Sequence, residues 1–493
     1  MNESQYKWLC NFCNNIIFEK NIYFIPWLNV IREHPIFLKN YENIFKKKSF
    51  ISYQSHLQYN KFKYIVWWTI HLASCIPLKK KNKSLVIKKN QIKNLDYLFI
   101  SHKLINDLSN SDDDFYFGSV PHDLVKIGYK VKILAINHAP KNKKIYISRF
   151  YELLDKKTNF SSEIAIHSKL KKQSNRIKKI LITTKGILAK RILQKSSIEA
   201  MAPSAHFVGR MEVQIKRYIE QYKPDVLITT FEGHSWEKIV FATAKKINPN
   251  ITCIGYQHSH HFRLQNGIRF MKDTNLNPDI IFTSGSNGKK YCEKIFQNLP
   301  ILNVGTRRVQ ISNSIAKQTL AFKDKVCLVV PEGIIDECIK MFNYSILCAI
   351  KNPSVQFIFR LHPLISLNQL ISRSSIYKNM PSNVSFSNNS LIDDAKKSKW
   401  ALYRGSTAII EICKEEVMPI YLETKGELSI DPLFNVNKLK TNVTNVNDFV
   451  NIISCDKPKN INKIIEYCDT LFSKLDISSF KKNKIKEILR NYD

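Results

Sequence analysis

Acidic residues are scarce in this sequence: of 493 residues, 41 are aspartate or glutamate and 76 are lysine or arginine. The formal net charge of +35 is typical of proteins that bind nucleic acid or an anionic membrane surface. The sequence lacks an arginine-rich patch, an aromatic RNA-stacking motif and a recognition helix, so we expect no nucleic-acid partner. Lysine is abundant together with asparagine and isoleucine, as expected of an A/T-rich genome, and this composition accounts for part of the basic excess.

A disulfide framework and a metal site are also not expected. Eleven cysteines, an odd number, are scattered through expected strands and helices of a long chain, which favours a reducing compartment. Cys10 and Cys13 have metal-ligand spacing, but no second pair follows at a suitable distance, so we interpret them as part of a helical face. The aspartates at 112–114 stand in a Ser/Asn-rich loop with no strand before it, and we interpret them as solvated. We predict no metal and no cofactor.

The sequence contains no long hydrophobic run. Residues 1–20 lack the pattern of a signal peptide. The most apolar run, 64–78, is shorter than the roughly 20 residues that cross a bilayer, and Lys79–Lys81 follow it. A buried strand or helix is favoured there over contact with a membrane surface. We expect a cytoplasmic protein, with peripheral attachment to an anionic membrane at the inner face of the plasma membrane as the open alternative.

Length and pattern predict an α/β protein of more than one domain. We expect an aromatic-rich helical extension over 1–90, a Rossmann-like domain over 91–310, and a second one over 311–493 with helices at its end. Residues 161–221 are helical and strongly basic in pattern, and Arg307 to Thr319 is the predicted linker.

Candidate site residues of the second domain follow predicted strands. The strand 355–360 runs into His362 and Pro363, and the proline should hold His362 on a rigid loop. A second strand, 400–403, is followed by a tight turn and then by a helix whose first amides point at that turn. A third strand, 325–330, leads to another turn at the same strand-end face. The residues of the two turns are Arg404, Gly405, Ser406, Thr407, Glu332 and Gly333.

Two candidates lie in the first domain. The strand 225–230 is followed by Phe231, Glu232 and Gly233, and the strand 251–256 leads into a histidine-rich loop that contains His258. This loop has no carboxylate at a spacing that suits a metal, so we take His258 as a substrate contact, with a structural loop histidine as the alternative.

The segment Arg360-Leu-His362-Pro363 with its following Ser/Thr turn resembles the C-terminal half of GT-B glycosyltransferases that use CMP-activated sugars, such as bacterial sialyltransferases and Kdo transferases. That family pairs the His-Pro motif with an acidic-Gly motif, for which Glu232-Gly233 is the match. Phe231 replaces the first acidic residue of the sialyltransferase motif, which weakens an assignment to sialic acid. The resemblance covers about the last three fifths of the chain. It implies a GT-B fold, with two Rossmann-like domains facing a central cleft and C-terminal helices that return to the first domain.

The resemblance implies a metal-independent enzyme that transfers sialic acid, another nonulosonic acid or Kdo from a CMP-sugar to a glycan or glycolipid of the bacterial surface, in capsule or lipopolysaccharide. Glu232 would be the general base, with its pKa raised by an apolar cleft. His362 would hydrogen-bond the departing phosphate, whose charge Ser406 and Thr407 would share. Arg360, Pro363 and the two turns would contact the donor. Three alternatives stay open: a transferase of UDP- or GDP-sugars, a polyol-phosphate transferase, and a non-catalytic polysaccharide-assembly protein.

Overall fold

The structure, a computed structural model, describes most of the chain. The described residues are 1–19, 25–41, 50–76, 94–103, 113–138, 150–307, 325–363, 365–374, 377, 379–454 and 461–492. All but the first residue of the linker predicted from Arg307 to Thr319 lies outside them, as do Asp112 and Lys79–Lys81.

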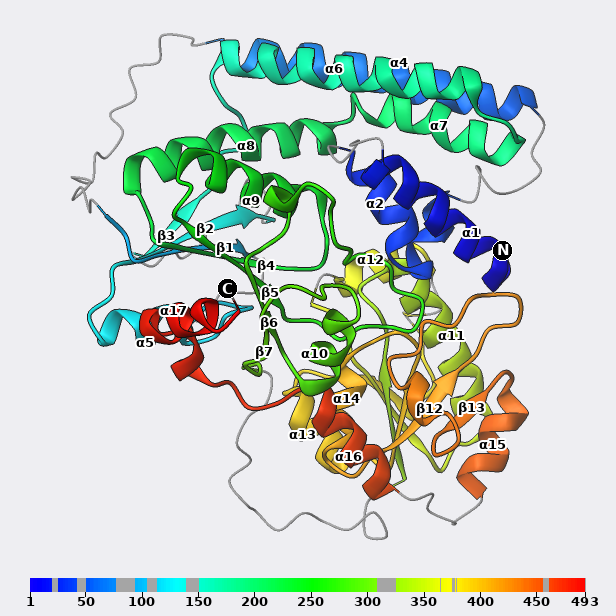
Figure 1. Cartoon of the computed structure of the whole chain (residues 1–493). Coiled ribbons are helices and arrows are strands. Elements are labelled where there is room, and N and C mark those ends of the chain that lie inside the picture. Colours follow the sequence, from blue (N-terminus) through cyan, green and yellow to red (C-terminus); the bar gives the residue numbers. More distant parts are fainter. Residues whose placement is uncertain are drawn as a thin grey trace.

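Two parallel β-sheets organise the described residues (Figure 1). The first has seven strands there, in the order β3-β2-β1-β4-β5-β6-β7. They are β1 (Tyr97–Lys103), β2 (Val131–Asn137), β3 (Tyr151–Leu153), β4 (Val226–Thr230), β5 (Thr252–Gln257), β6 (Ile280–Thr283) and β7 (Ile301–Asn303). The central strands are buried along nearly their whole length, as expected of parallel strands that helices cover on both faces.

The second sheet repeats this plan with six described strands, in the order β10-β9-β8-β11-β12-β13. They are β8 (Val326–Val330), β9 (Gln356–Phe359), β10 (Val384–Phe386), β11 (Trp400–Tyr403), β12 (Met418–Leu422) and β13 (Thr441–Val443). In both sheets the first strand of the domain lies in the middle and the chain winds outward on either side. The predicted fold class is therefore confirmed: the chain is α/β with two Rossmann-like domains in a GT-B arrangement.

Helices cover both faces of each sheet. Those of the first domain are α5 (Val120–Lys126), α6 (Phe160–Thr183), α7 (Ile187–Glu199), α8 (Pro203–Tyr222), α9 (Ser235–Ile247) and α10 (Ser286–Glu293). Those of the second are α11 (Ile335–Lys351), α12 (Leu367–Ile371), α13 (Leu391–Lys397), α14 (Ala408–Cys413), α15 (Val446–Ser454) and α16 (Ile461–Leu471). Separate clusters of buried apolar side chains fill the two faces of each sheet. The predicted helical character of 161–221 is confirmed.

The C-terminal segment returns to the first domain, as predicted. After α16 the chain crosses over and ends in α17 (Lys482–Arg490), which lies beside α5 in Figure 1. The Tyr97 hydroxyl of β1 donates to the Phe480 carbonyl at 2.7 Å, and Lys482 Nζ lies 2.7 Å from an Asp96 carboxylate oxygen. Phe480 is fully buried and packs edge-on against Phe282 of β6. The last helix therefore belongs to the core of the first domain.

The N-terminal helices form a further cluster of buried side chains. It comprises α1 (Glu3–Asn14), α2 (Pro26–Glu33) and residues of α6 and α7. Cys10 and Cys13 are buried on one face of α1, which confirms their interpretation as part of a helical face. Every cysteine in the described ranges is a free thiol.

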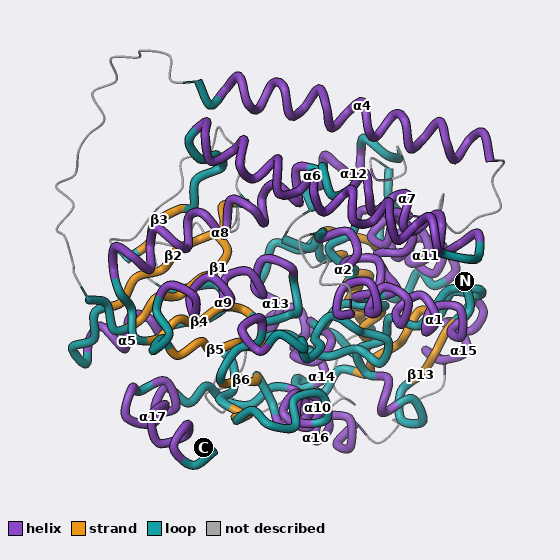
Figure 2. Tube along the Cα trace, turned by 45° about the horizontal axis from the view of Figure 1, so that its top comes forward, coloured by secondary structure: helices purple, strands orange, loops and turns teal. Residues whose placement is uncertain are grey.

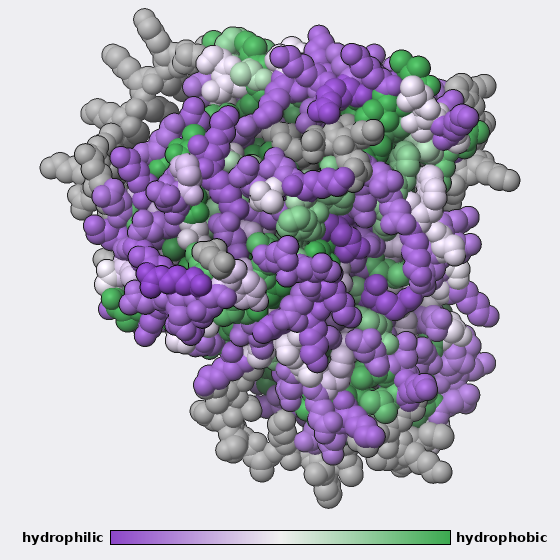
Figure 3. Space-filling view, in the orientation of Figure 1, coloured by the Kyte–Doolittle hydropathy of each residue, from purple (hydrophilic) through white to green (hydrophobic). Residues whose placement is uncertain are grey.

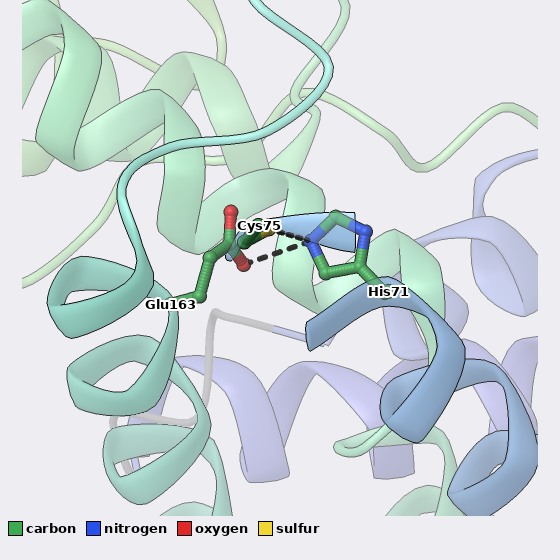
Figure 4. Close-up of side chains that lie close together, drawn as sticks. All are labelled: His71, Cys75 and Glu163. Atoms are coloured by element: carbon green, nitrogen blue, oxygen red, sulfur yellow. Dashed lines mark hydrogen bonds and ion pairs between the residues drawn. The ribbon is translucent and has the colours of Figure 1, made fainter. Parts of the chain in front are cut away.

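A long helix, α4 (Phe50–Ser74), lies across α6, α7 and α8 at the outer edge of the first domain (Figures 1 and 2). Near its end, His71 and Cys75 lie beside Glu163 of α6 (Figure 4), with potential ligand atoms within 4.8 Å of one another. Arg210 of α8 lies 3.3 Å from Glu163 Oε2 and 3.4 Å from His71 Nε2. Because a guanidinium already neutralises Glu163, we interpret this group as a buried ion pair that joins three helices. Among the described helices, none is long and apolar enough to cross a membrane.

Candidate functional site

Both sheets change winding direction at their first strand, and ligands of such sheets bind at the carboxyl ends of the strands on either side of that point. In the first sheet the point lies between β1 and β4, so His102 and the loop of Glu232 flank it. In the second it lies between β8 and β11, so Glu332 and Gly405 flank it. The sequence-predicted turns after β4, β8 and β11 therefore occupy the edges at which a ligand is expected.

The loop of Glu232 is held by its backbone. Glu237, in the first turn of α9, accepts hydrogen bonds from the amides of Glu232, Gly233 and His234 at 2.7 to 3.2 Å. Gly233 has a φ of +87°, and a Cβ at this position would lie 2.1 Å from the Gly267 carbonyl oxygen. Two chain segments thus approach one another closely enough to require glycine, and this contact sets the position of Glu232.

Glu232 is surrounded by histidines. His234 Nε2 lies 3.3 Å from Glu232 Oε2, and His258 Nε2 lies 3.8 Å from Glu232 Oε1. Burial by itself would raise the pKa of Glu232, but the two imidazoles lower it well below its usual range. The prediction of a raised pKa is therefore wrong, because the histidines outweigh desolvation. Burial likewise opposes a charge on His234, yet the carboxylates of Glu33 and Glu232 raise the pKa of His234 to about 10.

Several residues of this edge were not predicted from the sequence. Glu33 comes from α2 and lies 3.8 Å from His234 Nδ1. His102, near the end of β1, has its Nδ1 2.8 Å from His138 Nε2, and burial lowers its pKa to about 3. Tyr116 contacts the ring of His258 edge-on, at 4.6 Å between centroids. No local pattern marks Glu33, whereas a histidine near the carboxyl end of a predicted strand is a signal that could have been used for His102.

In the second domain the structure brings His362 and Gly333 together. A Cβ at Gly333 would lie between 2.7 and 3.1 Å from atoms of the His362 ring, so the imidazole lies against glycine backbone. Burial lowers the pKa of His362, which favours a neutral imidazole that can donate one hydrogen bond and accept another. Pro363 is exposed beside it.

Glu332 and Gly405 also lie together, because a Cβ at Gly405 would lie 2.6 Å from Glu332 Oε1. Burial and the nearby Glu337 raise the pKa of Glu332 to about 7. Arg404 is buried and bonds Glu337 and Glu427. The predicted open anion site with a basic side chain is therefore wrong for Arg404, whose charge two carboxylates already balance.

Arg360, Ser406 and Thr407 are the remaining residues predicted to contact the donor. Arg360 bonds Asp394 at the start of α13, and it donates to the Asn389 carbonyl at 2.8 Å, so its guanidinium joins two loops of the second domain. Ser406 is buried and Thr407 half-buried at the turn before α14, which is only six residues long.

Asp114, the last residue of the aspartate run, is not solvated as predicted. It is buried and accepts hydrogen bonds from the hydroxyls of Ser101 at 2.9 Å and Tyr151 at 2.7 Å.

The carboxyl ends of the two sheets meet at the domain boundary. His260, in the loop after β5, has its Nε2 2.9 Å from the Pro432 carbonyl, in the loop after β12. A cavity of about 710 Å³ opens beside this contact region, lined on one side by Arg404, Glu427 and Ile430 and on the other by residues of the N-terminal helices and of α7. The cavity therefore lies between these helices and the second domain, and neither Glu232 nor His362 is among its lining residues.

No protein-family model matches the chain, and no curated protein matches its sequence. Several solved structures are similar to most of the chain. One is the glycosyltransferase SnogD from Streptomyces nogalater, with 9% sequence identity and a TM-score of 0.42; the similarity covers 80% of this chain and 100% of that chain. Another is the UDP-GlcNAc 2-epimerase from Methanocaldococcus jannaschii, with 13% identity, coverage of 80% and 99%, and a TM-score of 0.38. A third is MurG from Acinetobacter baumannii, with 10% identity, coverage of 80% and 94%, and a TM-score of 0.35.

Proposed function

We propose that this protein is a glycosyltransferase that moves a sugar from a nucleotide-activated donor to a hydroxyl of a glycan acceptor. The observation that carries the proposal is that each sheet has a strand-end site, and that the loops after β5 and β12 meet where the two domains touch. One site presents the carboxylate of Glu232 among histidines, and the other presents His362 against Gly333. Two such edges can hold an acceptor and a donor separately, which a reaction between two bound substrates requires.

The second domain would bind the donor. A neutral His362 can donate a hydrogen bond to a phosphate oxygen, and the hydroxyls of Ser406 and Thr407 stand at the next turn of the same edge. Glu332, with a pKa of about 7, can accept a hydrogen bond from a sugar hydroxyl or donate one when it is protonated. Hydrogen bonds to a charged phosphate contribute roughly 1.5 to 3 kcal/mol each.

The first domain would activate the acceptor. As the acceptor oxygen bonds the anomeric carbon and the bond from that carbon to the donor phosphate breaks, the hydroxyl proton becomes strongly acidic. The Glu232 carboxylate, kept ionised by His234 and His258, would then take this proton, although its lowered pKa makes it a weak base before the bond forms. Negative charge grows on the departing phosphate at the same time, where His362 would balance it.

The first donor to test is a CMP-sugar, because the resemblance carried by Arg360, His362 and Pro363 is to enzymes of that class. A nonulosonic acid or Kdo would be the sugar. The decisive experiment incubates the purified full chain with CMP-, UDP- and GDP-sugars and measures the released nucleotide, together with thermal stabilisation by CMP, UMP and GMP. A ligand that binds only the folded state raises the melting temperature by mass action, so we expect the largest shift with CMP.

Each other result has a distinct meaning. Larger shifts and nucleotide release with a uridine or guanosine donor would keep a glycosyltransferase and replace its donor. Stabilisation without release from any sugar nucleotide would favour a polysaccharide-assembly protein that binds but does not catalyse. No effect of any nucleotide would contradict the proposed function itself.

A further inference from the structure

The outward face of α4 is apolar although nothing in the described residues covers it. Five large side chains of the helix, and Ile76 just beyond its end, are between 40 and 66% exposed; the five are Tyr59, Phe62, Ile65, Val66 and Ile70. These five recur at the three- and four-residue spacing that places side chains on one side of a helix. Lys61 and Lys63, both exposed, fall about 200° apart around the helix and therefore flank this apolar face on either side.

The opposite face of α4 packs against α6 and α7. The Tyr64 hydroxyl donates to Glu199 of α7 at 2.9 Å, and Trp68 stacks on His167 of α6 at 4.2 Å between ring centroids. The Tyr53 hydroxyl donates to the Arg191 carbonyl at 2.7 Å. The sequence-based prediction of a buried element at 64–78 is therefore right for one face of the helix and wrong for the other. Rotation of α4 would break these contacts, so its apolar face is held outward.

Basic side chains border this face, and the described helices α4 and α6 carry no exposed acidic side chain. Lys171 and Lys178, both exposed, follow His167 on α6 by four and eleven residues, and they therefore lie on the side of α6 that borders α4. The sequence has no acidic residue between Glu42 and Asp96, and Glu163, which is buried, is the only one between residues 160 and 198. In Figure 3 the upper edge of the molecule, formed by α6 in this view, is mainly hydrophilic with scattered apolar patches.

We propose that the α4–α6 surface, formed by these six apolar side chains and the lysines Lys61, Lys63, Lys171 and Lys178, lies on an anionic lipid bilayer. Apolar side chains of a surface helix enter the boundary between headgroups and acyl chains, and flanking lysines extend to the phosphates. A second copy of the chain is a poorer occupant, because a two-fold contact would set these lysines against their own copies. The proposal goes beyond the proposed function and does not depend on the donor.

Co-sedimentation of the full chain with vesicles tests the proposal. One set contains phosphatidylcholine alone, and the other adds phosphatidylglycerol. We expect the parent to bind the anionic set. The variant Phe62→Ser/Val66→Ser/Ile70→Ser should bind at least about tenfold more weakly. The variant Lys171→Gln/Lys178→Gln should bind about 30-fold more weakly, because each lysine contributes roughly a fivefold factor. The control Ile127→Ser/Leu347→Ser/Ile350→Ser removes apolar side chains that are 53 to 60% exposed elsewhere, and it should bind as the parent does.

All the substituted side chains are exposed, so circular dichroism and melting temperature should stay unchanged in every variant. Equal sedimentation of the α4 variant and the control would overturn the proposal. Equal binding to both vesicle sets would overturn its anionic part. A dimer of the parent that becomes a monomer in the α4 variant, with vesicle binding unchanged, would assign the surface to contact between copies instead. The vesicles carry no sugar, so these results stand apart from any donor assay.

Discussion

The charge of His234 makes the stability of this protein depend on pH in a direction that the structure specifies. Its pKa in the folded protein is about 10, against 6.5 for an ordinary histidine, because Glu33 and Glu232 outweigh the effect of burial. A raised folded-state pKa stabilises the protein fully below pH 6.5, and this stabilisation is lost as the pH rises to about 10. The full interval corresponds to nearly 5 kcal/mol at about 1.4 kcal/mol per pH unit.

The measured contribution of the His234 charge to the unfolding free energy should be smaller than this value. The side chains of His234 and Glu232 are 30 and 27% exposed, so solvent screens their interaction, and we expect about 2 kcal/mol. Urea unfolding of the parent and of His234→Gln between pH 6 and 10 measures it, with His122→Gln as a control for the loss of a histidine. The stability difference between parent and His234→Gln should be largest at pH 6 and shrink steadily toward pH 10. A difference that does not change over this range would refute the ion pair.

Three further substitutions test the loop of Glu232, the ion pair of Arg404 and the packing of the C-terminal segment on the first domain. Gly233→Ala should cost more than 2 kcal/mol of unfolding free energy in a denaturation experiment, while Gly186→Ala, with nearly the same φ of +89° but nothing within 4 Å, should cost only about 1 kcal/mol. Arg404→Met should cost about 3 to 5 kcal/mol because it leaves Glu337 buried without its guanidinium, and the double variant Arg404→Met/Glu337→Met should recover much of that loss. Phe480→Ala should lower the melting temperature of the first domain, at a cost of about 3 to 5 kcal/mol, if the C-terminal return belongs to its core.

The sequence predicted the elements that follow local rules. The strands preceding Glu232, His258 and His362 are where their apolar patterns indicate, and each ends in the predicted loop. Because both sheets are parallel, residues after neighbouring strands meet at one edge, which is why Glu332, Gly333, His362 and Gly405 are found together.

What the sequence did not predict depends on packing between distant segments. Glu33 and His234 are 201 positions apart in the sequence, and Arg404 contacts Glu337 and Glu427 only after helix α11 and two loops have packed together. The first contact helps to keep His234 charged, and His234 with His258 lowers the pKa of Glu232 that we expected to be raised. The second neutralises Arg404, which we expected to bind an anion. The apolar run at 64–78 predicted a buried strand or helix, but the pattern alone could not show that only one face of α4 meets the core.

The central claim is a division of labour, in which the second domain binds the donor and the first activates the acceptor. Calorimetric titration of CMP, run beside turnover of a CMP-sugar, tests it in two variants. His362→Ala should weaken CMP binding by roughly 10- to 100-fold. Glu232→Gln should bind CMP as the parent does while its turnover falls by about a hundredfold or more. Unchanged CMP affinity in His362→Ala, or near-parental turnover in a folded Glu232→Gln protein, would contradict the account.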